Sequence, residues 1–238
     1  QAQTMQDETG KLYYALDANQ FPPAVRLWLT LIWQQNSDII EDGEAMIDTP
    51  AGQEALSFIN EMFDNGYADP ELNYSAAQEV FLAGDVAIFQ NGTWVVDQYN
   101  REAPFEYKVV NFPALYDTEA VWANSHLWAV PRGSDDATYE AALEFVAFLN
   151  DHVKEWSLGT GHLAPRQSVL ASEEFKEAPQ RANIANTANI AHLVPAVQNW
   201  QAVEDILKEE LESTWLTGAE PAEALQDAQA RVGDELSQ

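Results

Sequence analysis

The first third of the chain shows two different spacings of apolar residues. Leu12 to Leu16 form an unbroken apolar run, which predicts a short buried strand. From Ala24 to Trp33 the apolar positions recur at i, i+3, i+4 and i+7, which is the pattern of an amphipathic helix. Thr49-Pro50 is typical of a helix start and Asn65-Gly66 of a helix end. This region therefore predicts one strand followed by two helices.

The rest of the chain continues to alternate between helices and strands. In order, the pattern predicts a helix over 75–81, a strand over 86–89, a helix beginning over 94–99, strands over 107–112 and 127–130, and helices over 197–211 and 222–236. Asp135 or Asp136 is expected to cap a long periodic helix between the last of these strands and the final helices. Its core-facing side is predicted to consist of Tyr139, Ala142, Leu143, Val146 and Leu149. Because strands and helices interleave, the predicted fold class is α/β.

The charge balance excludes two classes of partner. The 238 residues include 11 Lys plus Arg and 39 Asp plus Glu, which gives a formal net charge of −28. Such a charge repels phosphate backbones and anionic lipid, so neither nucleic acid nor a membrane surface is expected as a partner. A saline habitat and an ordinary acidic exported protein both account for the acidity. With 46% hydrophobic residues, the chain has ample material for a core.

The motifs that carry common catalytic and metal chemistry are missing from the sequence. The four histidines, His126, His152, His162 and His192, do not have the i, i+4 spacing of a helical zinc site, and there is no cysteine. Gly159-Thr160-Gly161 lacks the lysine and the preceding strand of a phosphate-binding loop. We therefore predict no metal, no cofactor and no catalytic residue. Carboxylates are so numerous that a pair at glycosidase spacing would arise by chance, and a glycoside hydrolase is left open on that account.

Several of the eight tryptophans lie at the ends of predicted elements. Trp94 follows a turn after a strand, Trp200 lies at the start of a helix, and Trp122 precedes the polar residues Asn124 to His126. Indole rings in such positions can line a cleft and pack against the C–H faces of sugar rings. The alternative for each ring is an ordinary place in the core or at its edge.

The segment Phe81 to Trp94, FLAGDVAIFQNGTW, resembles the signature of family 1 extracellular solute-binding proteins, the maltose-binding-protein-like receptors of ABC sugar importers. Five other segments are similar to this family in the same order along the chain: Gln20-Phe21 with the helix to Trp33, Ser125 to Pro131, Ala141 to Phe145, Gly161 to Arg166, and Gly218 to Leu225. One departure is Asn36-Ser37, where the family usually has Gly-Gly.

The resemblance implies a periplasmic-binding-protein-like fold of type II. In that fold, two α/β lobes joined by crossing strands close over a ligand. The similarity begins well inside the family's proteins, so most of the amino-terminal lobe has no counterpart here, and we expect a fragment. Residues 1–124 and 171–238 are expected to form the two parts of the carboxy-terminal lobe, and 125–170 to belong to the amino-terminal lobe.

The resemblance also implies which residues bind the ligand in the cleft between the lobes. Trp94 and Trp200 would be stacking platforms, and Phe21 would be a third aromatic wall. Asn124, Ser125 and His126 would lie where the chain crosses between lobes and would bond sugar hydroxyls, because such side chains donate and accept hydrogen bonds. Gln20 is a lesser candidate, and Arg166 is lesser still.

The function implied is that of a non-catalytic, extracellular or periplasmic sugar-binding component of an ABC transporter. The implied partners are a carbohydrate and the transporter permease, and another chain or fragment would complete the amino-terminal lobe. A lipid anchor upstream of Gln1 and the identity of the sugar are left open, because such receptors vary their side chains on a shared frame. Another small polar solute, such as glycerol phosphate or a polyamine, is the alternative ligand.

Overall fold

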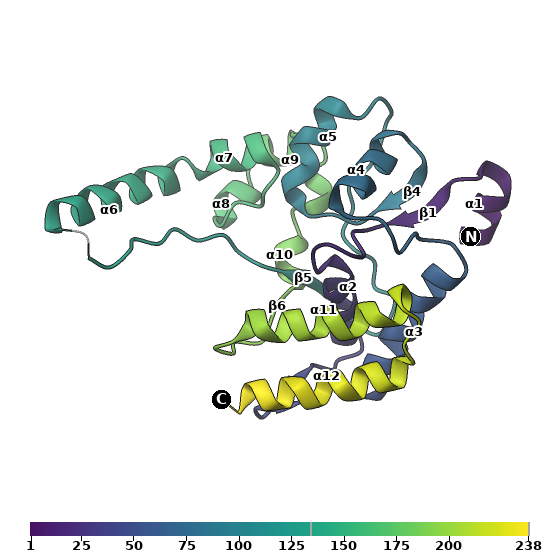
Figure 1. Cartoon of the computed structure of the whole chain (residues 1–238). Coiled ribbons are helices and arrows are strands. Elements are labelled where there is room, and N and C mark those ends of the chain that lie inside the picture. The colour runs from purple at the N-terminus through teal and green to yellow at the C-terminus, as the bar shows by residue number, and fades with distance from the viewer. Residues whose placement is uncertain (134, 238) are drawn as a thin grey trace. The chain divides into compact units, whose positions relative to one another are not determined.

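The computed structural model describes residues 1–133 and 135–237 (Figure 1). The chain divides into two compact units, and it passes from one to the other four times. Unit 1 comprises Gln1–Asn91, Phe112–Ala123 and Ile190–Gln238, and unit 2 comprises Gly92–Asn111 and Asn124–Asn189. The lobe boundaries expected at residues 124 and 170 stay a prediction.

Unit 1 contains three small sheets surrounded by helices. Its elements are α1 Ala2–Thr9, β1 Leu12–Ala15, α2 Pro23–Gln34, β2 Ile40–Glu41, β3 Glu44–Ala45, α3 Pro50–Asp64, α4 Tyr74–Leu82, β4 Val86–Phe89, β5 Val121–Ala123, β6 Ala191–Leu193, α11 Trp200–Leu216 and α12 Pro221–Leu236. The strands β1 and β4 pair in parallel, as do β5 and β6, whereas β2 and β3 form an antiparallel hairpin. The mixture of strands and helices confirms the predicted α/β class.

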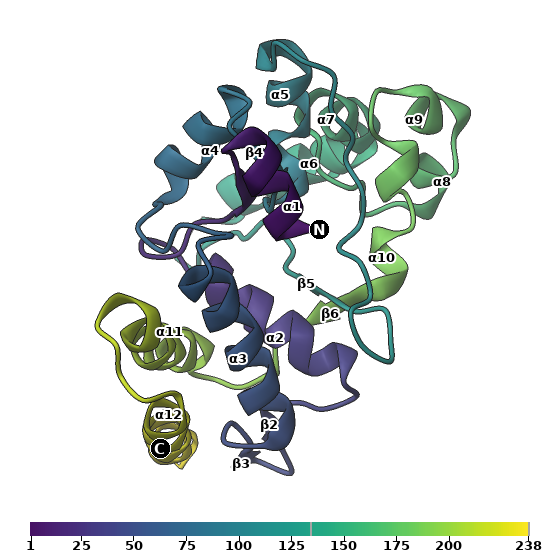
Figure 2. The same ribbon diagram turned by 90° about the vertical axis from the view of Figure 1, so that its right-hand side faces the viewer.

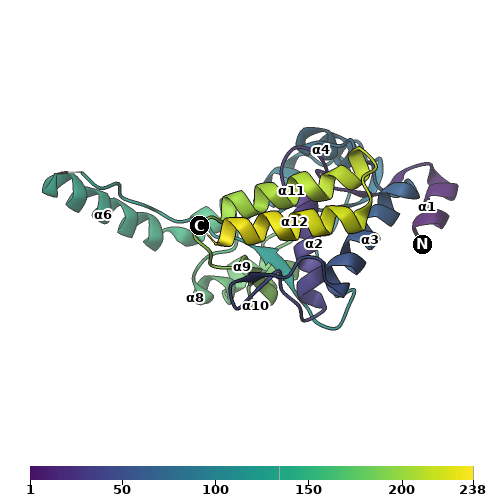
Figure 3. The same ribbon diagram turned by 60° about the horizontal axis from the view of Figure 1, so that its bottom comes forward.

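Helix α2 is the centre of the core of unit 1. Ten of its 12 residues are buried, because α3, α11 and β5 all pack against it. The sequence pattern predicts a helix with one apolar face, but the structure buries this helix on nearly all sides. Helices α11 and α12 lie side by side and cover the core beside α2 and α3 (Figures 2 and 3).

Two buried polar side chains join α2 to neighbouring backbone. The Trp28 indole Nε1 donates to the Gly52 carbonyl at 2.9 Å. The Gln34 amide nitrogen donates to the carbonyls of Pro113 and Ala120 at 3.0 and 3.1 Å. Because buried polar groups are costly when unpaired, these bonds fix where α3 and the 113–120 segment meet the helix.

Unit 2 is mostly helical and has a smaller core. Its elements are the 3₁₀ turn η1 Thr93–Val95, α5 Val96–Glu102, α6 Asp136–Asp151, α7 Val153–Thr160, α8 Gln167–Leu170, α9 Glu173–Glu177 and η2 Ala182–Ile184, and α10 Thr187–Ile190 follows at the boundary with unit 1. Val153, Ala164, Val169 and Phe175 are buried together. Helix α7 packs against α5, so the turn that carries Trp94 is attached to the main body of this unit.

Two predicted strands are wrong. Residues 107–112 are irregular, and the side-chain amide of Gln180 bonds their backbone, donating to the Tyr107 carbonyl at 2.8 Å and accepting from the Val109 amide at 2.9 Å. The Gln180 amide therefore makes the hydrogen bonds that the backbone of a neighbouring strand would otherwise make. Residues 127–130 have no strand partner within the described part of the chain, and Leu127 and Trp128 are 79% and 65% exposed. An apolar run therefore forms a strand only where a partner backbone is available.

The predicted core-facing side of the long helix is also wrong. Helix α6 begins where predicted, because the Asp135 carboxylate accepts from the Thr138 backbone amide at 3.0 Å. None of its described residues is buried, and Tyr139 and Leu143 are 47% and 46% exposed. The periodicity identified a helix, but the described residues of unit 2 leave its apolar stripe partly or fully exposed.

A buried aspartate holds the turn that carries Gln20 and Phe21. Asp17 follows β1 and is only 2% exposed. Its carboxylate accepts from the backbone amides of Asn19, Gln20 and Phe21 at 3.3, 2.9 and 3.0 Å. The next residue, Ala18, donates its amide to Leu72 and accepts from the Trp215 indole. The turn is therefore fixed both internally and against the core.

A glycine fixes the loop after α7 against the Trp94 turn. Gly161 has φ of +96°. A Cβ at this position would lie 2.3 Å from the Thr93 carbonyl oxygen. Left-handed backbone and lack of space together require glycine. Its amide donates to the Ser157 carbonyl at 3.1 Å, which closes the end of α7.

We expect Gly161→Ala to destabilise unit 2. Left-handed backbone costs a non-glycine residue roughly 1–3 kcal/mol, and overpacking adds about 1–3 kcal/mol. Hydrogen exchange should show faster opening of the amides in α5 and α7. Gly159→Ala is the matched control, because Gly159 is helical and has free space around its Cα. Equal exchange in the two variants would contradict the packing argument.

We expect Asp17→Ala to destabilise unit 1 by about 1–3 kcal/mol, because three backbone amides lose the buried carboxylate that accepts from them. Urea unfolding followed by circular dichroism measures the change. Asp69→Ala is the control, since the Asp69 carboxylate accepts from the Glu71 amide in an exposed bond. Asp17→Asn keeps one side-chain oxygen and should retain part of the stability. If both alanine variants unfolded at the same urea concentration, the role assigned to Asp17 would be wrong.

Candidate functional site

The turn after β1 presents an aromatic ring and an amide from unit 1. The Phe21 ring is 50% exposed and meets the Tyr74 ring edge to face, with centroids 5.8 Å apart and planes at 86°. Tyr74 is the first residue of α4. Since Asp17 fixes the backbone of Gln20 and Phe21, the exposed ring is held in a defined place. This geometry suits a stacking surface, and the ligand-binding role of both residues stays a prediction.

Trp200 lies in a different setting. It is the first residue of α11, is partly buried, and packs against the core of unit 1. The preceding Asn199 donates its side-chain amide to Glu235 of α12 at 2.7 Å. The start of α11 is therefore attached to α12. As a partly buried ring, Trp200 offers less surface to a ligand than Phe21 does.

A charged cluster that sequence reasoning missed lies just before the polar segment Asn124 to His126. The Arg26 guanidinium lies 4.1 Å above the centre of the Trp122 ring, and its Nε donates to the Glu204 carboxylate at 3.3 Å. The Trp122 backbone amide donates to the Thr30 hydroxyl at 2.9 Å. Arg26 is the one charged residue in α2. A single cation on an otherwise apolar helix was the sequence feature that could have pointed to this cluster.

In unit 2, Trp94 projects from the 3₁₀ turn η1. Its indole is 40% exposed and lies over the Cα of Gly92, where any Cβ would overlap the ring. Gly92 therefore makes room for the indole to lie back over the turn. The sequence correctly placed this tryptophan at the tip of an element, and its role as a stacking platform stays a prediction.

His126 lies next to two residues that the sequence did not identify as functional. The His126 ring meets the His162 ring edge to face, with centroids 5.1 Å apart and planes at 78°. The His162 ring stacks on Trp156 of α7 at 4.7 Å and 28°. A histidine after a Gly-Thr-Gly loop and a tryptophan six residues before it were the sequence signals, but nothing in the spacing alone linked them to His126.

The remaining predicted residues make mainly local bonds. Asn124 accepts from the Ser125 backbone amide at 2.8 Å, and the Ser125 hydroxyl donates to the His126 carbonyl at 3.2 Å. Both side chains are exposed. The Arg166 guanidinium donates to the Asp151 carboxylate at 2.9 Å. Arg166 is therefore already paired, which makes it a weaker candidate for a ligand contact.

The predicted residues are divided between the two units. Unit 1 contains Gln20, Phe21 and Trp200, and unit 2 contains Trp94, Asn124, Ser125, His126 and Arg166. Within unit 2 the loop after α7 brings His162 beside His126, and it also contacts the Trp94 turn through Gly161. The structure thus adds His162 and Trp156 to the exposed aromatic groups of unit 2.

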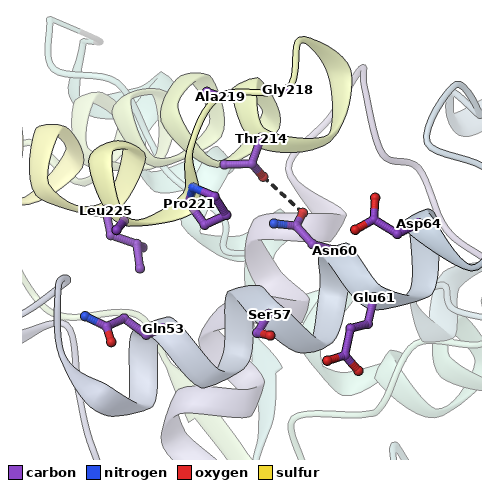
Figure 4. A pocket seen from close by; sticks show the side chains of 11 residues that line it. Gln53, Ser57, Asn60, Glu61, Asp64, Thr214, Gly218, Ala219, Pro221 and Leu225 are labelled. Atoms are coloured by element: carbon purple, nitrogen blue, oxygen red, sulfur yellow. Dashed lines mark hydrogen bonds between the residues drawn. The ribbon is translucent and has the colours of Figure 1, made fainter.

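A hollow elsewhere in unit 1 contains none of the predicted residues. It has a volume of about 480 Å³ and lies between α3 and the start of α12 (Figure 4). The Thr214 hydroxyl donates to Asn60 across it at 3.0 Å, and Glu61 and Asp64 extend from α3 nearby. Its lining combines polar side chains of α3 with apolar residues of α12 such as Pro221 and Leu225, and it includes no aromatic ring.

The described residues contain neither a cluster of metal ligands nor a helix that could span a membrane. Among residues 1–133 and 135–237, no three or more His, Asp or Glu side chains are grouped as metal ligands. Within the same part of the chain, every helix is too short or too polar to span a bilayer.

Comparison with known proteins places the chain in a structural class. It aligns over 99% of its length with the maltose-bound MalE3 of T. maritima, at a TM-score of 0.87 and 18% identity, and covers 62% of that chain. It aligns equally far with the cyclic alpha-maltosyl-1,6-maltose binding protein of Arthrobacter globiformis, at a TM-score of 0.77 and 26% identity, again covering 62%. The fold is that of the type II periplasmic binding proteins, as the sequence predicts.

Sequence comparison agrees with the fold. The chain is 26% identical over 230 residues to the sn-glycerol-3-phosphate-binding periplasmic protein UgpB of Escherichia coli O6:H1, a match that covers 88% of this chain and 51% of UgpB. The chain spans about half the length of the curated relatives it matches. Residues 2–183, well over half of the chain, match the sequence profile of the family described as bacterial extracellular solute-binding protein. This chain therefore belongs to the bacterial extracellular solute-binding proteins.

Proposed function

We propose that this chain binds a sugar or oligosaccharide as the solute-binding component of an ABC importer, without breaking or forming a bond in it. The observation that carries the proposal is the exposure of two aromatic rings on fixed turns. Phe21 is 50% exposed on the Asp17 turn, and Trp94 is 40% exposed over Gly92. Exposed flat rings held by the backbone are suited to pack against the C–H faces of sugars.

Polar side chains are the second requirement of a sugar-binding site. A sugar hydroxyl needs both donors and acceptors within reach, and Asn124, Ser125, His126 and Gln20 offer both. Trp200 is proposed as a further ring and Arg166 as a minor contact. In such a receptor the ligand changes the protein's conformation by its contacts alone, and the permease recognises the loaded form. We place the protein in the periplasm or outside the cell, where its family acts.

The named relatives offer one competing ligand class. The E. coli relative is a glycerol-3-phosphate-binding protein, whereas the T. maritima structure holds maltose. The net charge of −28 disfavours an anionic ligand, because the protein's field repels it over several ångströms of solvent. We therefore propose a neutral, polyhydroxylated ligand.

The exposed apolar surface of unit 2 suggests a second partner. Leu127, Trp128, Leu143, Phe145 and Phe148 are all exposed, and residues 127–130 are extended without a strand partner in the described chain. Exposed apolar residues beside unpaired backbone form a template for added structure. We propose that the rest of the amino-terminal lobe covers this surface, because the relatives with this fold are longer than the chain.

We expect saturation-transfer NMR to detect weak binding of maltose and maltodextrins, and Trp94→Ala to lower the affinity about 5- to 10-fold. The reason is the loss of a stacked ring, which contributes roughly 1 kcal/mol. Trp128→Ala is the matched control, since it removes an indole that is even more exposed. Saturation transfer to sn-glycerol 3-phosphate but to no sugar would overturn the choice of ligand. Turnover of a chromogenic glycoside would overturn the non-catalytic assignment.

We expect the polypeptide encoded upstream of Gln1, supplied separately, to protect the amides of residues 127–130 from hydrogen exchange. Replacing Leu127 and Trp128 by serine should abolish this protection, because the apolar contact is lost. Leu216→Ser is the control, as Leu216 is an exposed apolar residue of unit 1. Protection that instead grows with the concentration of the 238-residue chain alone would identify a second copy as the occupant.

A further inference from the structure

Three rings of unit 2 contact one another in a way that the sequence did not predict. We call these rings, His126, Trp156 and His162, the His162 cluster. Trp156 lies beneath the His162 ring, with centroids 4.7 Å apart and planes at 28°. His126 meets the same imidazole edge to face at 5.1 Å. His162 is only partly buried, and Trp156 is 40% exposed. The rings therefore contact one another and also remain partly accessible to solvent.

The backbone under His162 is unusually well fixed. Gly161 is buried against the Thr93 carbonyl. The buried Ser157 hydroxyl donates to the His162 carbonyl at 2.5 Å. The imidazole itself is oriented by a 3.0 Å bond between its Nδ1 and the Thr160 hydroxyl. Residues held by such supporting bonds are suited to recognise a ligand, because little freedom is lost on binding.

One ring nitrogen of His162 is available to a ligand. The Thr160 hydroxyl occupies Nδ1, and in the part of the chain that the structure describes no hydrogen bond uses Nε2. Gly161 touches the turn that carries Trp94, so His162 is one residue away from a direct contact with that turn. An oriented imidazole is thus attached to a loop that packs against the turn of a proposed stacking ring.

The charge state of His162 determines which ligand it suits. Burial, and to a lesser degree the neighbouring His126, lower the pKa of His162 below its ordinary value. Three neighbouring charged groups are paired: Asp97 with Arg101, Lys154 with Glu174, and Arg166 with Asp151. Glu155 of α7 forms no ion pair within residues 1–133 and 135–237. The imidazole is therefore neutral at neutral pH. A neutral imidazole donates or accepts a hydrogen bond, as a hydroxyl does, but it supplies no positive charge for a phosphate.

We propose that His162, supported by Trp156 and bordered by His126, binds a hydroxyl group of the ligand and selects neutral polyhydroxylated compounds over phosphate esters. This inference rests on the proposed sugar-binding function and adds two binding residues, His162 and Trp156, to it. Trp156 orients the imidazole by stacking and offers its exposed edge to the same ligand. A proton on His162 removes its acceptor and weakens the contact with a neutral hydroxyl.

The test compares His162→Ala, His162→Gln and the control His152→Ala by NMR titration with maltose and with sn-glycerol 3-phosphate. His152 is an exposed histidine of the same unit, stacked on Phe148. We expect His162→Ala to weaken maltose binding about 5-fold or more. His162→Gln should retain most of the affinity, because the amide also donates and accepts, and the control should be unchanged. Circular dichroism checks that each variant is folded.

The pH dependence gives an independent readout. Maltose affinity should be constant above the pKa of His162 and should fall as the pH decreases through it, and this fall should be absent in His162→Gln. Unchanged maltose binding in His162→Ala, with weaker binding in Trp94→Ala, would overturn this inference and leave the proposed function intact. Absence of maltose binding in all proteins, including the unaltered chain, would overturn the proposed function itself. Tighter binding of sn-glycerol 3-phosphate than of maltose would overturn the selectivity.

Discussion

The enclosure of α2 is the constraint on which unit 1 depends. Ten of its 12 residues are buried, and the elements that bury them come from positions as distant as α3, β5 and α11. Burial of a large apolar side chain contributes roughly 1.5–3 kcal/mol, so the buried side chains of this helix contribute substantially to the stability of the unit. Its buried polar groups, Trp28 and Gln34, determine where the neighbouring backbone lies. The Asp17 turn and the start of α11 then take their positions from this packed centre.

Unit 2 depends less on a buried apolar core than unit 1 does. Its core is small, and much of its order comes from polar and steric details: the Gln180 amide that bonds the 107–109 backbone, the Ser157 hydroxyl, and the space left by Gly161. Such local devices fix individual loops, including the one beneath Trp94 and His162. They do not cover large apolar surfaces, which explains why α6 and residues 127–130 stay exposed.

The sequence predicted elements well where the residues of the element itself determine its structure. Val86–Phe89 is a strand as expected, and Asp135 caps α6 as expected. It failed where the outcome depends on a distant partner. Residues 107–112 have the composition of a strand, but a side chain 71 residues beyond Val109 takes the partner's place. The sequence assigned no role to His162, because its stacking on Trp156 and its contact with His126 arise only in the folded chain.

The pairing of β1 with β4 and of β5 with β6 has a consequence for how the protein folds. The first pair joins Leu12 to Val86, and the second joins Val121 to Ala191. Contacts so distant along the chain form slowly, because the loop between them must close before the contact repays the lost entropy. Helix α11, which lies in the last segment of unit 1, also covers part of α2. During synthesis, part of the apolar surface of α2 therefore stays exposed to water until Trp200–Leu216 has been made and can pack against it.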